Sequence, residues 1–281
     1  MNIDKQNISI ENNTAYPINC DIRWKADSNQ APLLIIAHGF KAFKDWGFFP
    51  YISTVFADLG FITICFNFSM NGVSNNNDTY DRPDLFENNT VSIQINDLKK
   101  ILSSLNNQNF LLDKVKQKWN GQIFLLGHSL GAAISILIAT ENSNIRKIAL
   151  WGPISKVDRY SPRQKEKWKK DYKMTFKDNR TGIELSIGLG FLEDIESNIE
   201  KYNLPNTVNT LQIPMLIVHG KEDMTVKPAE SAKLAEMYKG DNLFYHIIEN
   251  TGHTFGVEHP MNMTTPALEK AIEITNYFLL K

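Results

Sequence analysis

The sequence predicts an α/β protein with a mostly parallel central sheet. Short apolar runs alternate with segments whose apolar residues recur at helical spacing, and short links join them. The run from Pro32 to Phe40, PLLIIAHGF, is apolar up to a His-Gly pair, which is typical of a strand buried on both faces. Alternating strands and helices with short links indicate a parallel sheet with right-handed crossovers.

The elements are expected in a regular order. The runs NISIEN and INCDIRWKA, joined by the turn-prone NNTAYP, predict an antiparallel pair at the start. Gly60 is the expected C-terminal cap of the first helix. The remaining expected elements are helices over 46–60, 91–105, 228–238 and 266–280, a helix directly after Ser129, and strands over 61–68, 122–127, 145–152, 211–220 and 243–249.

The regular alternation stops between residues 154 and 206. This stretch is polar and basic with scattered aromatic residues, and we interpret it as a lid inserted into a core formed by 1–153 and 207–281. Within it, KMTFKDNRTGIELSI predicts a hairpin around 179–182. The basic run RQKEKWKKDYK is interpreted as a solvated helix face, with a preference for an anionic acyl group as the alternative.

Composition excludes several classes of protein. The net charge of −1 disfavours a general nucleic-acid-binding or polybasic membrane-binding protein. The N-terminus lacks the apolar region of a signal peptide, and no apolar run is long enough to span a membrane, so we expect a cytoplasmic protein. Cys20 and Cys65 make neither a metal spacing nor a disulfide framework, and no histidine motif indicates a metal site.

The pentapeptide GHSLG, Gly127 to Gly131, places a serine where a buried strand turns into a helix. Such a tight turn holds the serine in a strained conformation and exposes its Oγ, which is the arrangement of a nucleophile elbow. Glycines on both sides are needed because side chains there would meet the neighbouring strand and helix. We therefore predict Ser129 as a nucleophile, with close packing of small residues as the alternative.

A serine nucleophile needs a base and an acid that orients the base. Asp223 lies just beyond the strand MLIVHG, and His253 lies beyond the next strand, so both should reach the same edge of the sheet as Ser129. The order Ser, Asp, His is the one expected in this setting. Glu222 is the nearest rival acid, and Glu249 precedes the histidine loop and should point back into the sheet.

Backbone N–H groups should bind the oxyanion in such a site. Leu130 follows the nucleophile at the start of a helix, and Phe40 ends the early strand motif AHGF, so these two N–H groups are the candidates. His38 is expected to shape the turn before Phe40. His128 is expected to pack or hydrogen-bond below the site.

The segments AHGF, GHSLG, HGKEDMTV and TGHTF together resemble an α/β-hydrolase. The likeness is closer to small esterases and serine-aminopeptidase-like hydrolases, including bacterial cinnamoyl and feruloyl esterases, with a lid after the sixth strand. The resemblance implies a serine hydrolase that cleaves small carboxylic esters through an acyl-enzyme, without a cofactor or metal. One departure lies at 67–74, NFSMNGVS, where Asn67 and Met70 replace a family aspartate and glycine.

Two other functions remain open at this point. A serine aminopeptidase would need a lid carboxylate to capture a free amine, for which Glu193, Asp194 and Glu196 are available. A binding protein without catalysis on the same fold is the other alternative. Trp168 and Phe176 either line the substrate pocket or dock the lid, and homo-oligomerisation is left open.

Overall fold

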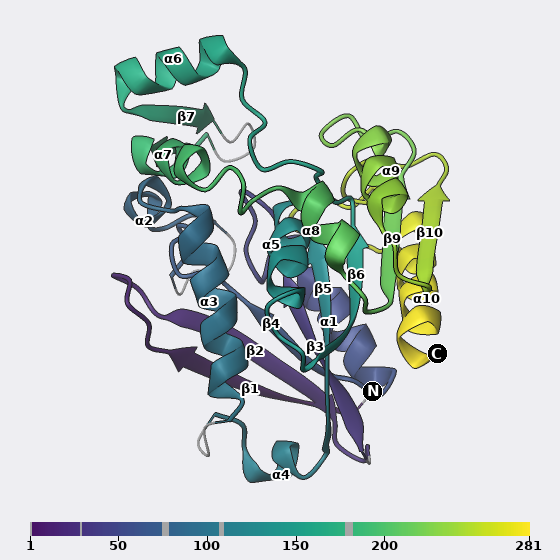
Figure 1. Ribbon diagram of the computed structural model, residues 1–281. Coiled ribbons are helices and arrows are strands. Elements are labelled where there is room, and N and C mark those ends of the chain that lie inside the picture. The colour runs from purple at the N-terminus through teal and green to yellow at the C-terminus, as the bar shows by residue number, and fades with distance from the viewer. Residues whose placement is uncertain (1, 29, 75–78, 107–109, 178–181) are drawn as a thin grey trace.

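The computed structural model describes residues 2–28, 30–74, 79–106, 110–177 and 182–281. An eight-stranded sheet runs through the molecule in the order β1-β2-β4-β3-β5-β6-β9-β10 (Figure 1). β2 runs antiparallel to both of its neighbours, β1 and β4, and the other pairs of adjacent strands described in this sheet are parallel. The strands are β1 Ile3–Ile10, β2 Ile18–Lys25, β3 Ala31–Ala37, β4 Ile62–Phe66, β5 Trp119–His128, β6 Ile145–Trp151, β9 Met215–Gly220 and β10 Leu243–Ile248. The predicted mostly parallel α/β fold is confirmed.

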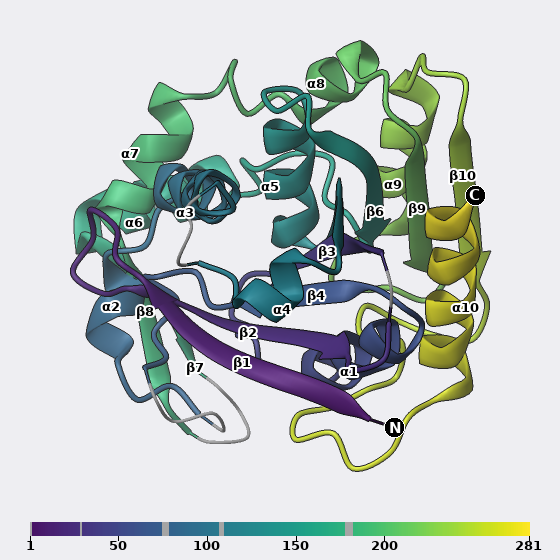
Figure 2. The same ribbon diagram turned by 90° about the horizontal axis from the view of Figure 1, so that it is seen from below.

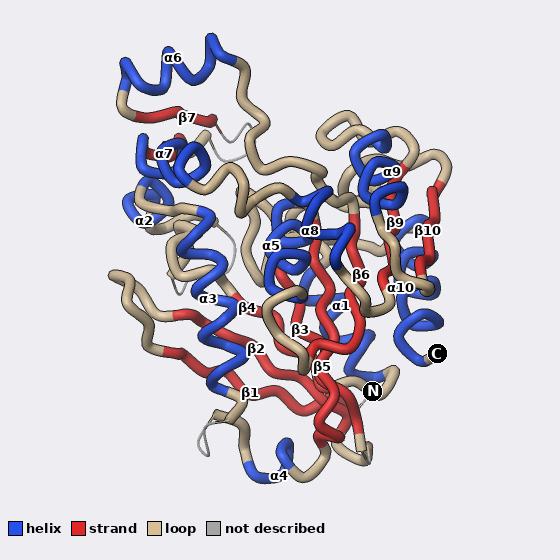
Figure 3. Tube along the Cα trace, in the orientation of Figure 1, coloured by secondary structure: helices blue, strands red, loops and turns tan. Residues whose placement is uncertain are grey.

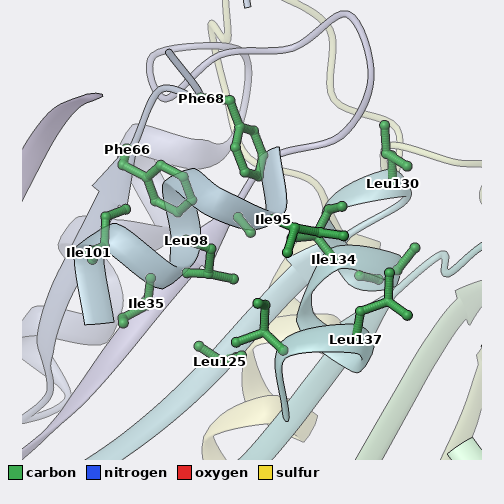
Figure 4. Close-up of a cluster of buried hydrophobic side chains, with 14 of the residues drawn as sticks. Ile35, Phe66, Phe68, Ile95, Leu98, Ile101, Leu125, Leu130, Ile134 and Leu137 are labelled. Carbon is green, nitrogen blue, oxygen red and sulfur yellow. The ribbon is translucent and has the colours of Figure 1, made fainter. Parts of the chain in front are cut away.

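Helices cover both faces of the sheet (Figure 2). Alternate residues of β3 divide between two buried clusters, with Leu33 and Ile35 in one and Leu34 and Ile36 in the other. The first cluster packs under α3 Val91–Ser104, α5 Leu130–Ala139, α8 Leu204–Thr210 and α9 Pro228–Met237, and the second under α1 Phe49–Asp58 and α10 Pro266–Leu280. Figure 4 shows α3 and α5 meeting over Ile35 and Leu125 of the sheet. The alternation explains why β3 is apolar throughout, because each of its faces is buried.

Residues between β6 and α8 form a separate group of elements above one end of the sheet (Figures 1 and 3). The group contains α6 Pro162–Asp171, the antiparallel strands β7 Lys173–Lys177 and β8 Glu184–Gly188, and α7 Leu189–Ser197. The two strands agree with the expected hairpin, although part of its turn, 178–181, lies outside the described residues. The sequence did not predict α7 or α8, nor the short helices α2 Pro83–Glu87 and α4 Asp113–Lys116.

The basic run on α6 pairs with nearby acids. Lys165 and Lys169 both form ion pairs with Glu196 of α7, and Lys167 pairs with Asp171 one turn along α6. These pairs agree with the interpretation of α6 as a solvated helix face. No helix among the described residues has the length and apolarity needed to cross a membrane.

A part-buried contact ties α7 of this upper group to α3, which packs on the sheet. Ser92, in the first turn of α3, donates its backbone N–H and its hydroxyl to the carboxylate of Asp194 on α7. The Tyr202 hydroxyl reaches the same carboxylate at 3.2 Å. A carboxylate at a helix N-terminus satisfies an orphan N–H group and interacts favourably with the helix dipole.

Replacing Asp194 with Ala should therefore lower the free energy of unfolding by about 1 to 3 kcal/mol, because the α3 N-terminus and Ser92 lose their acceptor. Denaturant unfolding measures this loss. Glu193→Ala, at an exposed position of the same helix, is the control and should change stability by less than about 0.5 kcal/mol. Equal losses in the two variants would show that the Asp194 contact contributes nothing specific.

Candidate active site

Ser129 occupies a strained turn between β5 and α5. Its φ and ψ are 56° and −117°, a backbone conformation that is uncommon for a residue with a side chain. A Cβ at Gly131 would lie 2.3 Å from the carbonyl oxygen of Ala37, and one at Gly127 would lie 2.5 Å from the Cα of Ala132. Only glycine fits at either position, so the two glycines let the helix approach the sheet closely enough to form the turn.

Asp223 lies in the loop after β9, buried and fully hydrogen-bonded. Its Oδ1 accepts the backbone N–H groups of Thr225 and Val226, each at 2.8 Å. Its Oδ2 lies 2.6 Å from Nδ1 of His253 and 3.1 Å from Nε2 of His219. Burial opposes ionisation, but the hydrogen bonds from His219 and His253 outweigh it and hold the pKa of Asp223 below its usual range.

His219 is a second histidine on Asp223 that the sequence reading did not single out. It is fully buried on β9, and its Nε2 also lies 2.8 Å from the carbonyl oxygen of Val226. Because that carbonyl can only accept, Nε2 must carry the hydrogen, and His219 donates to Asp223. The sequence offered one signal for this contact. In the segment HGKED, His219 lies near the end of the strand and Asp223 lies in the turn that follows it.

His253 follows β10 and lies beside two further residues that shape its position. Nε2 of His128 lies 3.0 Å from the backbone oxygen of His253, and the two ring centroids are 4.6 Å apart. Burial lowers the pKa of His128 to about 3, so this ring is neutral and donates to that oxygen. Gly152 has a φ of +51°, and a Cβ there would lie 3.2 Å from Nδ1 of His253. The sequence reading had also missed Gly152.

Ser129 and His253 open on one cavity of about 400 Å³. Phe40 and Leu130, the residues expected to supply oxyanion donors, line the same cavity, while Asp223 lies behind His253. His38 and Glu222 are not among the lining residues. The described residues that line the cavity are Gly39, Phe40, Lys41, Ala42, Trp46, His128, Ser129, Leu130, Ile154, Val157, Arg159, Tyr160, Phe176, Phe191, Thr225, His253 and Thr254.

Phe176 and Trp168, the two aromatic residues considered for the pocket, differ in their position relative to the cavity. Phe176 lines the cavity, with its ring edge-on to Phe40 at 5.5 Å between centroids. Trp168 does not line it, because its indole is buried and stacks on Phe191 at 6.2 Å. Of the two alternatives for Trp168, this placement favours docking over a position on the cavity wall, and Phe191 and Tyr160 take positions on the wall that the sequence had not assigned to any residue.

The remaining candidates have other partners. His38 is buried, its pKa is lowered to about 4 by burial, and its Nε2 accepts the N–H of Phe68 at 3.3 Å. Glu222 is exposed, and Glu249 pairs with Lys221. Asn67, which replaces the family aspartate, accepts the N–H of Lys44 at 2.7 Å and so supports the loop after β3. No group of three or more potential metal ligands occurs among the described residues.

Comparison with solved structures identifies the fold. Est1E from Butyrivibrio proteoclasticus, solved with ferulic acid bound, superposes with a TM-score of 0.70 at 18% identity, over 98% of this chain and 100% of that one. The protein has the α/β-hydrolase fold. Two more structures with this fold are similar. An esterase domain from Rhodothermus marinus superposes with a TM-score of 0.63 at 18% identity, over 99% of this chain and 98% of that one. Mouse α/β hydrolase domain-containing protein 10 superposes with a TM-score of 0.71 at 14% identity, over 98% of each chain.

The sequence comparison is more limited. The family "Serine aminopeptidase, S33" (Hydrolase_4) matches residues 94–202, which include the Ser129 turn but not Asp223 or His253. No curated protein matches the chain. The matched family is named for a serine aminopeptidase and the Rhodothermus marinus structure for an esterase, but at these identities the solved structures show the fold alone.

The lowered pKa of Asp223 predicts a pH-dependent contribution to stability. An unfolded aspartate titrates at about pH 3.9, so a carboxyl with a lower folded pKa stabilises the protein above that pH and loses its contribution as pH falls further. The gap in unfolding free energy between wild type and Asp223→Asn should thus be widest near neutral pH and narrow below about pH 4. Denaturant unfolding across this range measures the gap.

Asp241→Asn, at an exposed position, is the matched control and should show a small gap at every pH. A gap for Asp223→Asn that stays constant from neutral to acidic pH would contradict the account, because the carboxyl would then hold its proton equally well in the folded and unfolded chain.

Proposed function

We propose that the protein is a serine hydrolase of small carboxylic esters, with Ser129 as nucleophile, His253 as general base and Asp223 as orienting acid. The observation that carries the proposal is the opening of Ser129 and His253 on one cavity, with Asp223 Oδ2 2.6 Å from His253 Nδ1 behind them. The strained turn at Ser129 supports it, because strain of this kind gathers at functional residues.

The proposed reaction begins with attack of Ser129 Oγ on the ester carbonyl carbon. Nδ1 of His253 donates to Asp223, so Nε2 is the ring atom available to take the Ser129 proton. Asp223 stays ionised, because of its four hydrogen bonds, and offsets the charge of the imidazolium that forms.

The oxyanion of the tetrahedral intermediate also needs hydrogen-bond donors. The first N–H groups of a helix have no acceptor within the helix, which leaves the N–H of Leu130 at the start of α5 free to donate to the oxyanion. Phe40, from the loop after β3, is the proposed second donor. Collapse of the intermediate transfers the His253 proton to the leaving alcohol and forms the acyl-enzyme, and a water molecule then repeats the cycle and frees Ser129.

The charges around the cavity favour esters over aminoacyl peptides. Capture of a free amine needs a carboxylate, and none of the described residues that line the cavity is aspartate or glutamate. Of the three acids considered for this role, Asp194 binds the α3 N-terminus, Glu196 pairs with α6, and Glu193 is exposed on α7. The wall is largely aromatic and aliphatic, which suits an uncharged ester group, and esters of hydroxycinnamic acids belong in the substrate panel because Est1E was solved with ferulic acid.

We also propose that residues 154–206 act as a lid on a core formed by 1–153 and 207–281. Ile154, Val157, Tyr160, Phe176 and Phe191 from this stretch supply one wall of the cavity. Residues of the core supply Ser129 and its partners. The lid would therefore set the size of the accepted ester while the core performs the chemistry.

The Ser129→Ala variant tests the proposed chemistry. It should fold normally and lose turnover of short-chain 4-nitrophenyl esters by roughly 10⁴- to 10⁶-fold, because no nucleophile remains. A fluorophosphonate probe should label the wild type at Ser129 alone. Ser135→Ala is the matched control, since Ser135 lies nearly two turns further along α5 and donates its hydroxyl to the Gly131 carbonyl oxygen.

Turnover that survives in Ser129→Ala, or labelling at another residue, would refute the assignment. A folded wild type with no turnover of any ester in the panel would favour the non-catalytic binding protein instead. Faster turnover of aminoacyl amides than of esters would favour the aminopeptidase.

Phe176 and Trp168 should differ in their effect on ester preference. Phe176→Ala enlarges the cavity wall and should change the ratio of kcat/KM between a bulky and a small ester by about 10-fold. Trp168→Phe alters a buried contact away from the cavity and should leave that ratio unchanged while lowering stability. Kinetics with a size series of 4-nitrophenyl esters measures both, and an unchanged ratio in Phe176→Ala would remove Phe176 from the pocket.

A further inference from the structure

Two cations, Lys41 and Arg159, and no described acid line the cavity, and among the described residues only Arg159 of the two pairs with a carboxylate. Nη2 of Arg159 lies 3.0 Å from the carboxylate of Glu230 and donates to the backbone oxygen of Thr225 at 2.9 Å. Ser155 donates its N–H to the other oxygen of Glu230 at 2.9 Å, which keeps this pair in place. In the described part of the chain no carboxylate forms an ion pair with Lys41.

The backbone of Lys41, in the loop after β3, adopts a sterically unfavourable conformation. Lys41 has a φ of 55°, in the left-handed region that glycine enters freely and a residue with a side chain does not. Its carbonyl oxygen accepts a hydrogen bond from the hydroxyl of Tyr80, which fixes this conformation. A glycine would serve the turn equally well, so the turn itself gives no reason for a lysine at this position.

The ammonium of Lys41 is directed to the rim of the cavity. Its Nζ lies 5.1 Å from the centroid of the Phe176 ring, and Phe176 lines the cavity that contains Ser129. A cation–π contact of this kind orients an ammonium group but leaves its positive charge uncompensated. Lys41 is exposed, so its charge is available to a ligand that reaches the rim of the cavity.

We propose that Lys41 forms an anion subsite at the rim of the cavity and that the protein prefers esters carrying a carboxylate at the end remote from the scissile bond. This inference rests on the proposed ester hydrolysis and refines its substrate class. The charged end meets Lys41 over the Phe176 ring, and the apolar middle of the substrate lies along the aromatic wall.

The test compares substrates that differ only at that end. One series carries the charge on the acyl part, as 4-nitrophenyl esters of hexanoic acid, adipic acid (monoester) and 6-aminohexanoic acid. A second carries it on the alcohol part, as 4-acetoxybenzoate against 4-methylphenyl acetate. In at least one series the wild type should favour the carboxylate over the methyl-ended ester by roughly 5- to 10-fold in kcat/KM at low salt, and less at high salt.

Lys41→Met should bring that ratio close to the ratio of the uncatalysed hydrolysis rates of the same two esters, and Lys41→Glu should reverse the acyl series in favour of the ammonium ester. Lys156→Met, an exposed lysine that does not line the cavity, is the matched control and should keep the wild-type ratio. A wild type without preference in either series, or a preference that survives in Lys41→Met, overturns the proposal. If Ser129→Ala loses all turnover while the wild type shows no preference, or while the preference survives in Lys41→Met, the proposed ester hydrolysis still holds and only the Lys41 subsite is refuted.

A binding measurement keeps the proposal testable without turnover. 7-Oxooctanoate and 2-octanone are methyl ketones that cannot be hydrolysed and differ only in the terminal carboxylate. The anion should raise the melting temperature of wild type more than the neutral ketone does, and Lys41→Met should remove the difference. Equal shifts with both ketones in wild type would overturn the subsite even if the protein hydrolysed no ester.

Discussion

The close approach of α5 to the sheet is the constraint on which the site depends. Gly131 packs so tightly on the backbone of Ala37 that a Cβ would lie 2.3 Å from its carbonyl oxygen. This approach forces the chain through the left-handed turn at Ser129 and brings the N-terminus of α5 beside the loop after β3. Ser129, the N–H of Leu130 and the Phe40 loop are thereby gathered at one point before any lid residue takes part.

Parallel strand order supplies the rest of the arrangement. The strands β5, β6, β9 and β10 lie side by side, so the loops that follow them emerge at the same edge of the sheet. The loop after β9 carries Asp223, the loop after β10 carries His253, and the end of β6 contributes Gly152, which leaves room for the His253 ring. His219, buried on β9, donates to the same carboxylate oxygen as His253 and so helps to hold Asp223 in its ionised form.

Much of this arrangement could be predicted because its signals are local. Apolar periodicity located the strands and α10, and strand-turn-helix context singled out Ser129, with Asp223 and His253 following in order. The helices α7 and α8 were harder to predict, because their buried residues pack against distant elements. The sequence around Trp168 also does not reveal which way its ring points. The role of His219 depends on how the loop after β9 folds back onto that strand, and the role of Gly152 depends on the His253 ring from the loop after β10.

The central claim is that Ser129 becomes covalently acylated during turnover. Acid quenching of the protein a few milliseconds after mixing with excess 4-nitrophenyl ester, followed by peptide mass spectrometry, tests this directly. The account predicts one acyl group, on the peptide that contains Ser129, appearing together with a burst of 4-nitrophenol and absent from Ser129→Ala. Steady turnover in wild type with an acyl group on another residue would contradict it.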